Sequence, residues 1–120
     1  MTEKRKLLFW EGSSKKDFKE FPIPVQKDMG VALFVVQLGR TPDSAKPWKG
    51  LGSGVYELVF FFSGAAFTEI YTVRIGDAVH VLHAFQKKSK SGIATPQPDV
   101  ELIEKRWKAV LARYGASGRS

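Results

Sequence analysis

Three apolar runs in the middle of the chain follow one another closely and have the residue types of β-strands. They read VYELVFFF at 55–62, FTEIYTVRI at 67–75 and AVHVLHAF at 78–85. Short segments that contain glycine separate them, SGAA at 63–66 and GD at 76–77. Because such segments reverse the chain between neighbouring strands, the pattern predicts an antiparallel meander at the centre of the fold.

Further elements precede the predicted meander. LLFWE at 7–11 is typical of a short strand, and SSKKDFKEF at 13–21 predicts a helix that its first serines cap and Pro22 ends. VQKDMGVALFVVQL at 25–38 has apolar residues at helical spacing and predicts a second helix, although ALFVV at 32–36 is equally typical of a strand. The chain therefore opens with one strand and two helices.

The carboxyl-terminal segment at 99–115 has its apolar residues on one helical face, which predicts an amphipathic helix that ends at Gly115. The segment at 39–54 is dense in Gly, Pro, Ser and Lys and predicts a loop. We therefore predict one α+β domain over 1–120, with 115–120 as a flexible tail. Its antiparallel-dominated, twisted sheet of about four strands packs against two N-terminal helices and a C-terminal helix.

The composition excludes several classes of protein. No apolar run approaches the roughly 20 residues of a membrane span, and the run after the basic N-terminus is too short for a secretory signal. We therefore expect a cytoplasmic protein with no membrane role. The chain has no cysteine, which excludes disulfides, thiolate metal sites and a cysteine nucleophile. His80 and His83 are expected on opposite faces of a strand, so we expect neither a metal nor a cofactor.

An excess of positive charge favours a polyanionic partner. The chain has 19 Lys and Arg against 12 Asp and Glu, a formal net charge of +7, which a small domain can also carry for solubility alone. Lys87, Lys88 and Lys90 cluster after the third strand, with no acidic residue between Gln86 and Pro98. The cluster can hold a phosphate, or it can protect the end of an apolar strand from aggregation.

Three further positions offer chemistry. Arg74, near the end of the middle strand, presents a rigid fork for phosphate unless it forms an ion pair with Asp77 or Glu69. His83 can act as a general acid or base near neutral pH, or it can be a structural histidine of the sheet. The WK pair at 48–49 can stack on a base and bind its phosphate, or the tryptophan can pack over the edge of the core.

The run from Lys46 to Arg106 resembles the RelE/ParE toxin superfamily, specifically its phage-derived, HigB-like branch. The motifs that carry the resemblance are KPWKGLGSGVYEL, YTVRIGDAVHVLHAFQKKSKSG and IATPQPDVELIEKRW. The resemblance implies a compact sheet with helices against one face. It also implies a toxin of a type II toxin–antitoxin pair, inhibited by a HigA-like helix-turn-helix antitoxin in a hetero-oligomer.

The resemblance leaves two activities open. RelE-like members are ribosome-dependent endoribonucleases that cut mRNA, whereas ParE-like members inhibit DNA gyrase. The first implies a metal-independent, RNA-binding enzyme in which basic residues promote attack of a ribose 2′-OH on its phosphate and so inhibit translation. The alternative is a protein of the same fold that inhibits gyrase or only binds an antitoxin or nucleic acid. An unrelated basic nucleic-acid-binding module is a third possibility.

The resemblance assigns roles to individual residues. Lys87 and Lys88 match a lysine pair that clamps phosphate, Arg74 matches an arginine that stabilises the transition state, and His83 matches the histidine of the HAF motif. The residues expected to contact RNA are Lys49, Trp48, Tyr71 and Lys90. One departure is Thr68, which stands where the family commonly has an arginine. The loss of such a donor costs on the order of 100-fold in rate.

Overall fold

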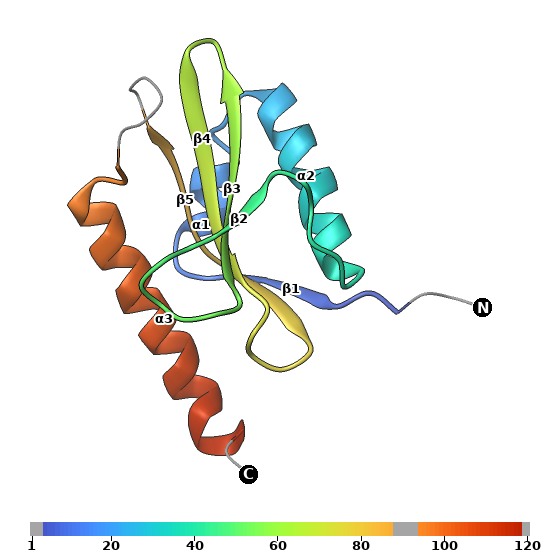
Figure 1. Ribbon diagram of the computed structural model, residues 1–120, viewed down its shortest axis with the longest axis vertical. Helices are drawn as coiled ribbons and strands as arrows, with labels where there is room; N and C mark the ends of the chain where they lie inside the picture. Colours follow the sequence, from blue (N-terminus) through green and yellow to red (C-terminus); the bar gives the residue numbers. More distant parts are fainter. Residues whose placement is uncertain (1–3, 88–93, 119–120) are drawn as a thin grey trace.

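The computed structural model describes residues 4–87 and 94–118 of the chain. Its elements follow in the order β1 (Leu7–Trp10), α1 (Ser14–Phe18), α2 (Ile23–Gln37), β2 (Ala45–Pro47), β3 (Val55–Phe62), β4 (Ala65–Thr72), β5 (Ala78–Lys87) and α3 (Gln97–Gly118) (Figure 1). The predicted α+β architecture, with two early helices and one late helix, is confirmed. No helix in the described ranges is long and apolar enough to cross a membrane.

The sheet has five strands in the order β1-β5-β4-β3-β2. Strands β3, β4 and β5 form the predicted antiparallel meander, and β1 adds in parallel to the outer edge of β5. Ser63 and Gly64 make the reversal between β3 and β4, both with positive φ (50° and 78°). This geometry suits a two-residue hairpin, because it matches the twist of the flanking strands.

Several boundaries differ from the predictions. Strand β2 lies inside the segment expected to be a loop, where it pairs with β3 through three residues, too few to show an alternating pattern. Helix α3 continues to Gly118, past the expected end at Gly115. The first serines do not cap α1 through their side chains. The hydroxyl of Ser14 donates instead to the backbone carbonyl of Val81, and so ties α1 to the sheet.

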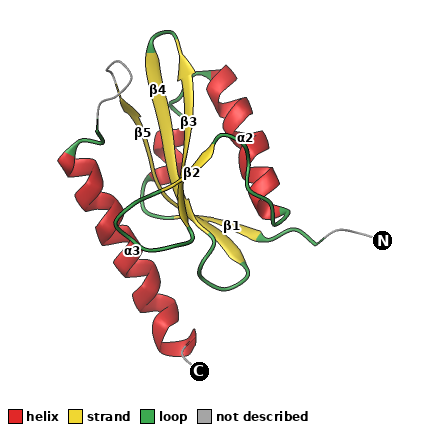
Figure 2. Ribbon diagram, in the orientation of Figure 1, coloured by secondary structure: helices red, strands yellow, loops and turns green. Residues whose placement is uncertain are grey.

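The helices cover both faces of the sheet (Figure 2). On β4, Ile70 packs with the apolar side of α3, whereas Tyr71 packs with α2. Phe18 of α1 shares a cluster with Val25 of α2, so α1 lies on the α2 side. The expectation that all helices pack against one face is therefore wrong. Because β4 is buried on both sides, its second face also needs an apolar cover, and α3 supplies it.

A β-bulge in β5 changes which side chains face α3. Ile70 pairs with His83 and Tyr71 pairs with Val81, which leaves Leu82 as an extra residue. A bulge shifts the inward and outward alternation by one position. His80 and His83 consequently both face α3, where His80 contacts the ring of Tyr114 and His83 contacts Asp99. The expectation that the two histidines point to opposite faces is wrong for this reason.

Candidate nucleic-acid interface

A groove of about 640 Å³ lies on the α3 side of the sheet, between β2, β3 and the beginning of α3. Its lining residues are Lys46, Pro47, Trp48, Lys49, Glu57, Ala94, Thr95 and Val100. Strand β2 builds one wall, because its pairing with β3 sets Lys46 directly opposite Glu57. Two lysines and one glutamate make the lining net positive.

Trp48 and Lys49, which the sequence offers as a stacking and charge pair, both line this groove. Trp48 is half-buried and packs against the cluster around Trp107, so it also covers the edge of the core. The N–H of Trp48 donates to the carbonyl of Val55 at 2.8 Å, which fixes the start of the loop. Lys46 was not among the predicted site residues, although the KPWK motif contains it.

Lys87 ends β5 on the same side of the sheet. It pairs with Ala66, and its Nζ lies 6.0 Å from the centroid of the Phe85 ring, two residues earlier on the same face. Lys88 and Lys90 lie outside the described residues. The chain is described again from residue 94, and Ala94 lines the groove. In sequence, the lysine-rich segment therefore connects the end of β5 to the groove.

Arg74 lies at the other end of the sheet. It follows Thr72, the last residue of β4, whereas Lys87 pairs with Ala66 near the first. Six residue steps along β4 separate Ala66 from Thr72, or roughly 20 Å at 3.4 Å per residue, and Arg74 lies beyond Thr72. The structure therefore does not bring Arg74 and Lys87 onto one phosphate, because the antiparallel meander sends their strand ends in opposite directions.

Arg74 supports the loop that follows the groove. Its Nη1 donates to the carbonyl of Leu51 (3.4 Å), and its guanidinium lies 5.3 Å from the centroid of the Trp107 ring. Gly54 has φ of +84°, and a Cβ there would overlap the Arg74 side chain. Within the described residues Arg74 forms an ion pair with neither Asp77 nor Glu69, the two alternative partners that the sequence offered. We conclude that Arg74 holds the loop at 48–54 in place.

Tyr71 lies in the core and not on a surface that a base can reach. Its side chain is 1% exposed under α2, and its ring stacks on Tyr56 with centroids 5.5 Å apart. Burial raises the pKa of the Tyr71 hydroxyl, and nearby Tyr56 raises it further. Its placement follows from the strand alternation that sets Ile70 on the α3 side.

His83 joins β5 to α3 through both ring nitrogens. Its Nε2 lies 2.8 Å from Oδ1 of Asp99, and its Nδ1 lies 3.4 Å from Nη1 of Arg106. A neutral ring protonated at Nε2 satisfies both contacts, since it donates to Asp99 and accepts from Arg106. Arg106 also donates to the carbonyl of Leu82 (2.9 Å) and the hydroxyl of Ser13 (3.0 Å). With 5% exposure, His83 is positioned as a structural link.

A second polar cluster ties β1 to the far part of α3. The buried carboxylate of Glu11 accepts from Nδ1 of His80 (2.9 Å) and from Nη2 of Arg113 (2.7 Å). Burial raises the pKa of Glu11, but the hydrogen bonds from His80 and Arg113 outweigh it and hold the pKa below its ordinary value. In the described part of the chain, no three His, Asp or Glu side chains gather as metal ligands would.

Comparison with known proteins places the chain in a family. A model described as "Phage derived protein Gp49-like (DUF891)" matches residues 16–108, well over half of the chain. The chain belongs to the Gp49-like family. This is a RelE-like toxin family, which confirms the resemblance predicted from the sequence motifs.

The Gp49-like chain also resembles one solved structure in fold. A chain in the crystal structure of the toxin–antitoxin complex RelBE2 from Mycobacterium tuberculosis is 16% identical, with a TM-score of 0.45. The match covers 73% of the Gp49-like chain and 98% of that chain. No curated protein matches the sequence.

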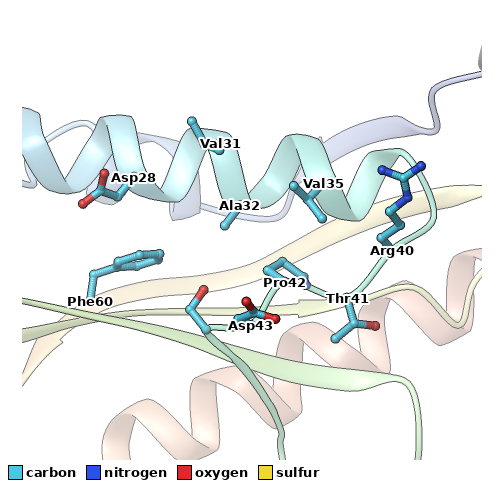
Figure 3. Close-up of a pocket in the computed structure, with 10 residues that line it drawn as sticks. Asp28, Val31, Ala32, Val35, Arg40, Thr41, Pro42, Asp43 and Phe60 are labelled. Carbon is cyan, nitrogen blue, oxygen red and sulfur yellow. The ribbon is translucent and has the colours of Figure 1, made fainter.

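The opposite side of the Gp49-like domain has an apolar groove of about 540 Å³ between α2 and β3 (Figure 3). Val31, Ala32 and Val35 of α2 line it, and Ala32 and Val35 lie on the side of the helix that faces Phe60 of β3. Val31 is 65% exposed. Two carboxylates, Asp28 and Asp43, also line this groove, and so does Arg40. Val31 is thus an exposed apolar residue at the edge of this groove, whereas Ala32 is buried.

Proposed function

We propose that this Gp49-like chain is the toxin of a type II toxin–antitoxin system and a ribosome-dependent endoribonuclease that cuts mRNA and inhibits translation. The family assignment supports the toxin role. The observation that carries the nuclease role is the groove on the α3 side, which Lys46 and Lys49 line together with Trp48. Its volume of about 640 Å³ is within the range of pockets that hold small ligands.

In this proposal a single RNA strand binds across the groove. A base stacks on Trp48, which tolerates any base because each has a π-face. The lysines at 46 and 49 hold the backbone by charge. Lys87, at the end of β5, clamps the strand farther along, and Lys88, the next residue in the sequence, is the second lysine of the proposed clamp. This set keeps the predicted lysines and Trp48 and adds Lys46.

The reaction needs positioned charge more than a dedicated base. The ribose 2′-OH attacks the adjacent phosphorus, the 2′-proton leaves to solvent or a basic group, and the bond to the 5′-oxygen breaks as that oxygen takes up a proton. The products are a 2′,3′-cyclic phosphate and a 5′-hydroxyl. Negative charge that builds on the phosphate oxygens is stabilised by the lysines. In this proposal Arg74 and His83 support the site without contacting the RNA. Arg74 holds the loop at 48–54 in place, and His83 links β5 to α3.

We also propose that a HigA-like helix-turn-helix antitoxin docks in the apolar groove under α2. Val31 is exposed beside Ala32 and Val35, and free apolar surface of this kind is stabilised when a partner covers it. Asp28 and Asp43 line this groove in an otherwise basic chain. A partner segment with apolar side chains flanked by lysine or arginine complements this surface.

Primer extension on cellular mRNA after brief induced expression tests the nuclease role. We expect discrete, in-frame cleavages from the wild type and a reduction on the order of 100-fold in the Lys46→Ala/Lys49→Ala variant. The Lys19→Ala/Lys27→Ala variant loses the same charge from exposed sites on and beside the N-terminal helices, outside this groove, and should cleave normally. Growth arrest with intact transcripts would instead indicate gyrase or another target.

Affinity for the protein encoded by the neighbouring gene tests the docking surface. Val31→Glu places a charge in the apolar groove and should weaken binding at least tenfold. Leu7→Glu changes an equally exposed apolar residue (66%) of β1, outside this groove, and should bind as the wild type does. Equal affinities of the two variants would remove the α2 groove from the interface.

A further inference from the structure

A third cavity, of about 320 Å³, lies between the β1–α1 turn and α3. It shares no lining residue with the groove around Trp48. Leu102 and Ala109 of α3 contribute apolar and small side chains to the lining, and Gly12 of the turn contributes backbone. Such a lining leaves room for a ligand to approach the polar groups.

Those polar groups are predominantly cationic. Lys105, Arg106 and Arg113 line the cavity with one carboxylate, Glu11. The carboxylate is already engaged, because Glu11 accepts hydrogen bonds from both His80 and Arg113. Three cations against one internally paired carboxylate give the cavity a surplus of positive charge, and such a concave site concentrates anions.

The arginines are held in position before any ligand arrives. Arg106 is fixed by hydrogen bonds to Leu82 and Ser13, and its guanidinium lies so close to Gly12 that a Cβ there would be 2.7 Å from Nε. Gly12 also has φ of +55°, so both backbone and space require glycine. Arg113 keeps 52% of its side chain exposed while it bonds Glu11, and a guanidinium has five N–H donors, so donors remain for an anion.

A rigid guanidinium fork with an adjacent ammonium matches the oxygens of a phosphate group. We propose that this cavity binds a backbone phosphate of RNA, as a second contact outside the groove around Trp48. The choice of RNA as the carrier of the phosphate rests on the proposed function. In this arrangement α3 has the groove at its beginning and the phosphate site along its later turns, so one RNA molecule can contact both.

Backbone NMR spectra of the whole protein test this site with two probes, inorganic phosphate and a short RNA with 2′-O-methyl groups, which cannot be cut. Both probes should shift the amide signals of Gly12, Lys105 and Ala109. The Lys105→Ala variant should bind the RNA roughly tenfold more weakly than the wild type. The RNA affinity of this variant should also depend less on salt, because one phosphate contact is lost. The slope of log K against log salt should be smaller in magnitude by about 0.7.

The matched control is Lys108→Ala, which removes the same charge from an exposed position on α3 that does not line the cavity. It should retain wild-type affinity and slope. Equal weakening by the two variants, or RNA binding without shifts at Gly12 and Lys105, would overturn the proposal. Shifts with phosphate but not with RNA would also overturn it. Lys105-dependent RNA binding without mRNA cleavage in cells would contradict the nuclease role and leave this site standing.

Discussion

The two faces of the sheet carry different kinds of side chains, although the same strands form both. On the α2 side, Leu58, Tyr71 and Val79 pack in a buried, mostly apolar layer. On the α3 side, His80 and His83 are hydrogen-bonded to charged groups, and two cavities with lysine and arginine open beside α3. In our proposal, neighbouring residues of one strand therefore serve either a protein-binding side or an RNA-binding side.

Glu69 is the exception on the α2 side. It pairs with Leu58 and Ala84, is 0% exposed, and neither of its carboxyl oxygens has a hydrogen-bond partner among the described residues. Burial raises the pKa of Glu69 to about 8, so the group is mostly protonated at neutral pH. His80 and His83 thus have charged hydrogen-bond partners on the α3 side, whereas on the α2 side burial keeps Glu69 neutral.

The largest expected effect is at Thr68, on the α3 side but closed to solvent. Its side chain is 0% exposed opposite Phe85, and its hydroxyl has no hydrogen-bond partner among the described residues. Thr68→Arg would bury an unpaired charge and should lower the free energy of unfolding by about 4 kcal/mol or more. Thr68→Val keeps the shape and should be nearly neutral.

Urea unfolding of both Thr68 variants measures this difference. An arginine that is tolerated at residue 68 and increases mRNA cleavage would show that the position is open to RNA. The α3 side would then be polar throughout its length. The arginine that the family commonly has at this position, and that Thr68 replaces here, would then have a function in cleavage.

The next effect is the pH dependence caused by Glu69. Its pKa is higher in the folded chain (about 8) than the ordinary value of 4.5, so the folded state binds the proton more tightly. The stability from this difference is fully present below about pH 4.5 and is lost as the pH rises through about 8. We expect a loss of a few kcal/mol between these limits.

Urea unfolding across this pH range should show that the slope disappears in Glu69→Gln, which cannot ionise. Glu69→Leu should be more stable than the wild type at neutral pH, because it removes two buried oxygens without partners. Parallel pH profiles for wild type and Glu69→Gln would show that the carboxyl has partners or water, and would weaken the contrast between the two faces.

The smallest effect concerns the link between β5 and α3. Asp99→Ala removes the acceptor of His83 Nε2 and should lower the free energy of unfolding by roughly 1–3 kcal/mol. Glu101→Ala, at an exposed position two residues later on the same helix, should change it by less than about 0.5 kcal/mol. If thermal unfolding shows the same loss of stability for both variants, the hydrogen bond between His83 and Asp99 does not stabilise the fold.

Local patterns were sufficient to predict most of the elements. The strands of the meander and the amphipathic α3 have periods that show in the sequence, and the second helix followed the spacing of its apolar residues. Strand β2 could not be predicted because three residues show no period. The bulge in β5 inserts Leu82 as an extra residue, and the sequence alone does not show it. Only the pairing of β5 with β4 reveals that His80 and His83 lie on the same side of the sheet.

The site was predictable in its residue types more than in its assembly. The lysines and Trp48 could be proposed from the sequence because charge and stacking are properties of single residues. Lys46 was missed because its place in the groove depends on β2 pairing with β3. The separation of Arg74 from Lys87 was already implied by the predicted meander, since antiparallel neighbours end at opposite edges. The cavity beside Gly12 depends on contacts between residues far apart in the sequence.

In our proposal the two faces of the sheet have separate functions, with RNA bound on the α3 side and the antitoxin on the α2 side. One experiment measures both activities, cleavage of ribosome-bound mRNA and affinity for the antitoxin, in Lys46→Ala/Lys49→Ala and in Val31→Glu. We expect the lysine variant to lose cleavage and keep antitoxin affinity, and Val31→Glu to do the reverse. Loss of both activities in either folded variant, or cleavage that survives without Lys46 and Lys49, would contradict the account.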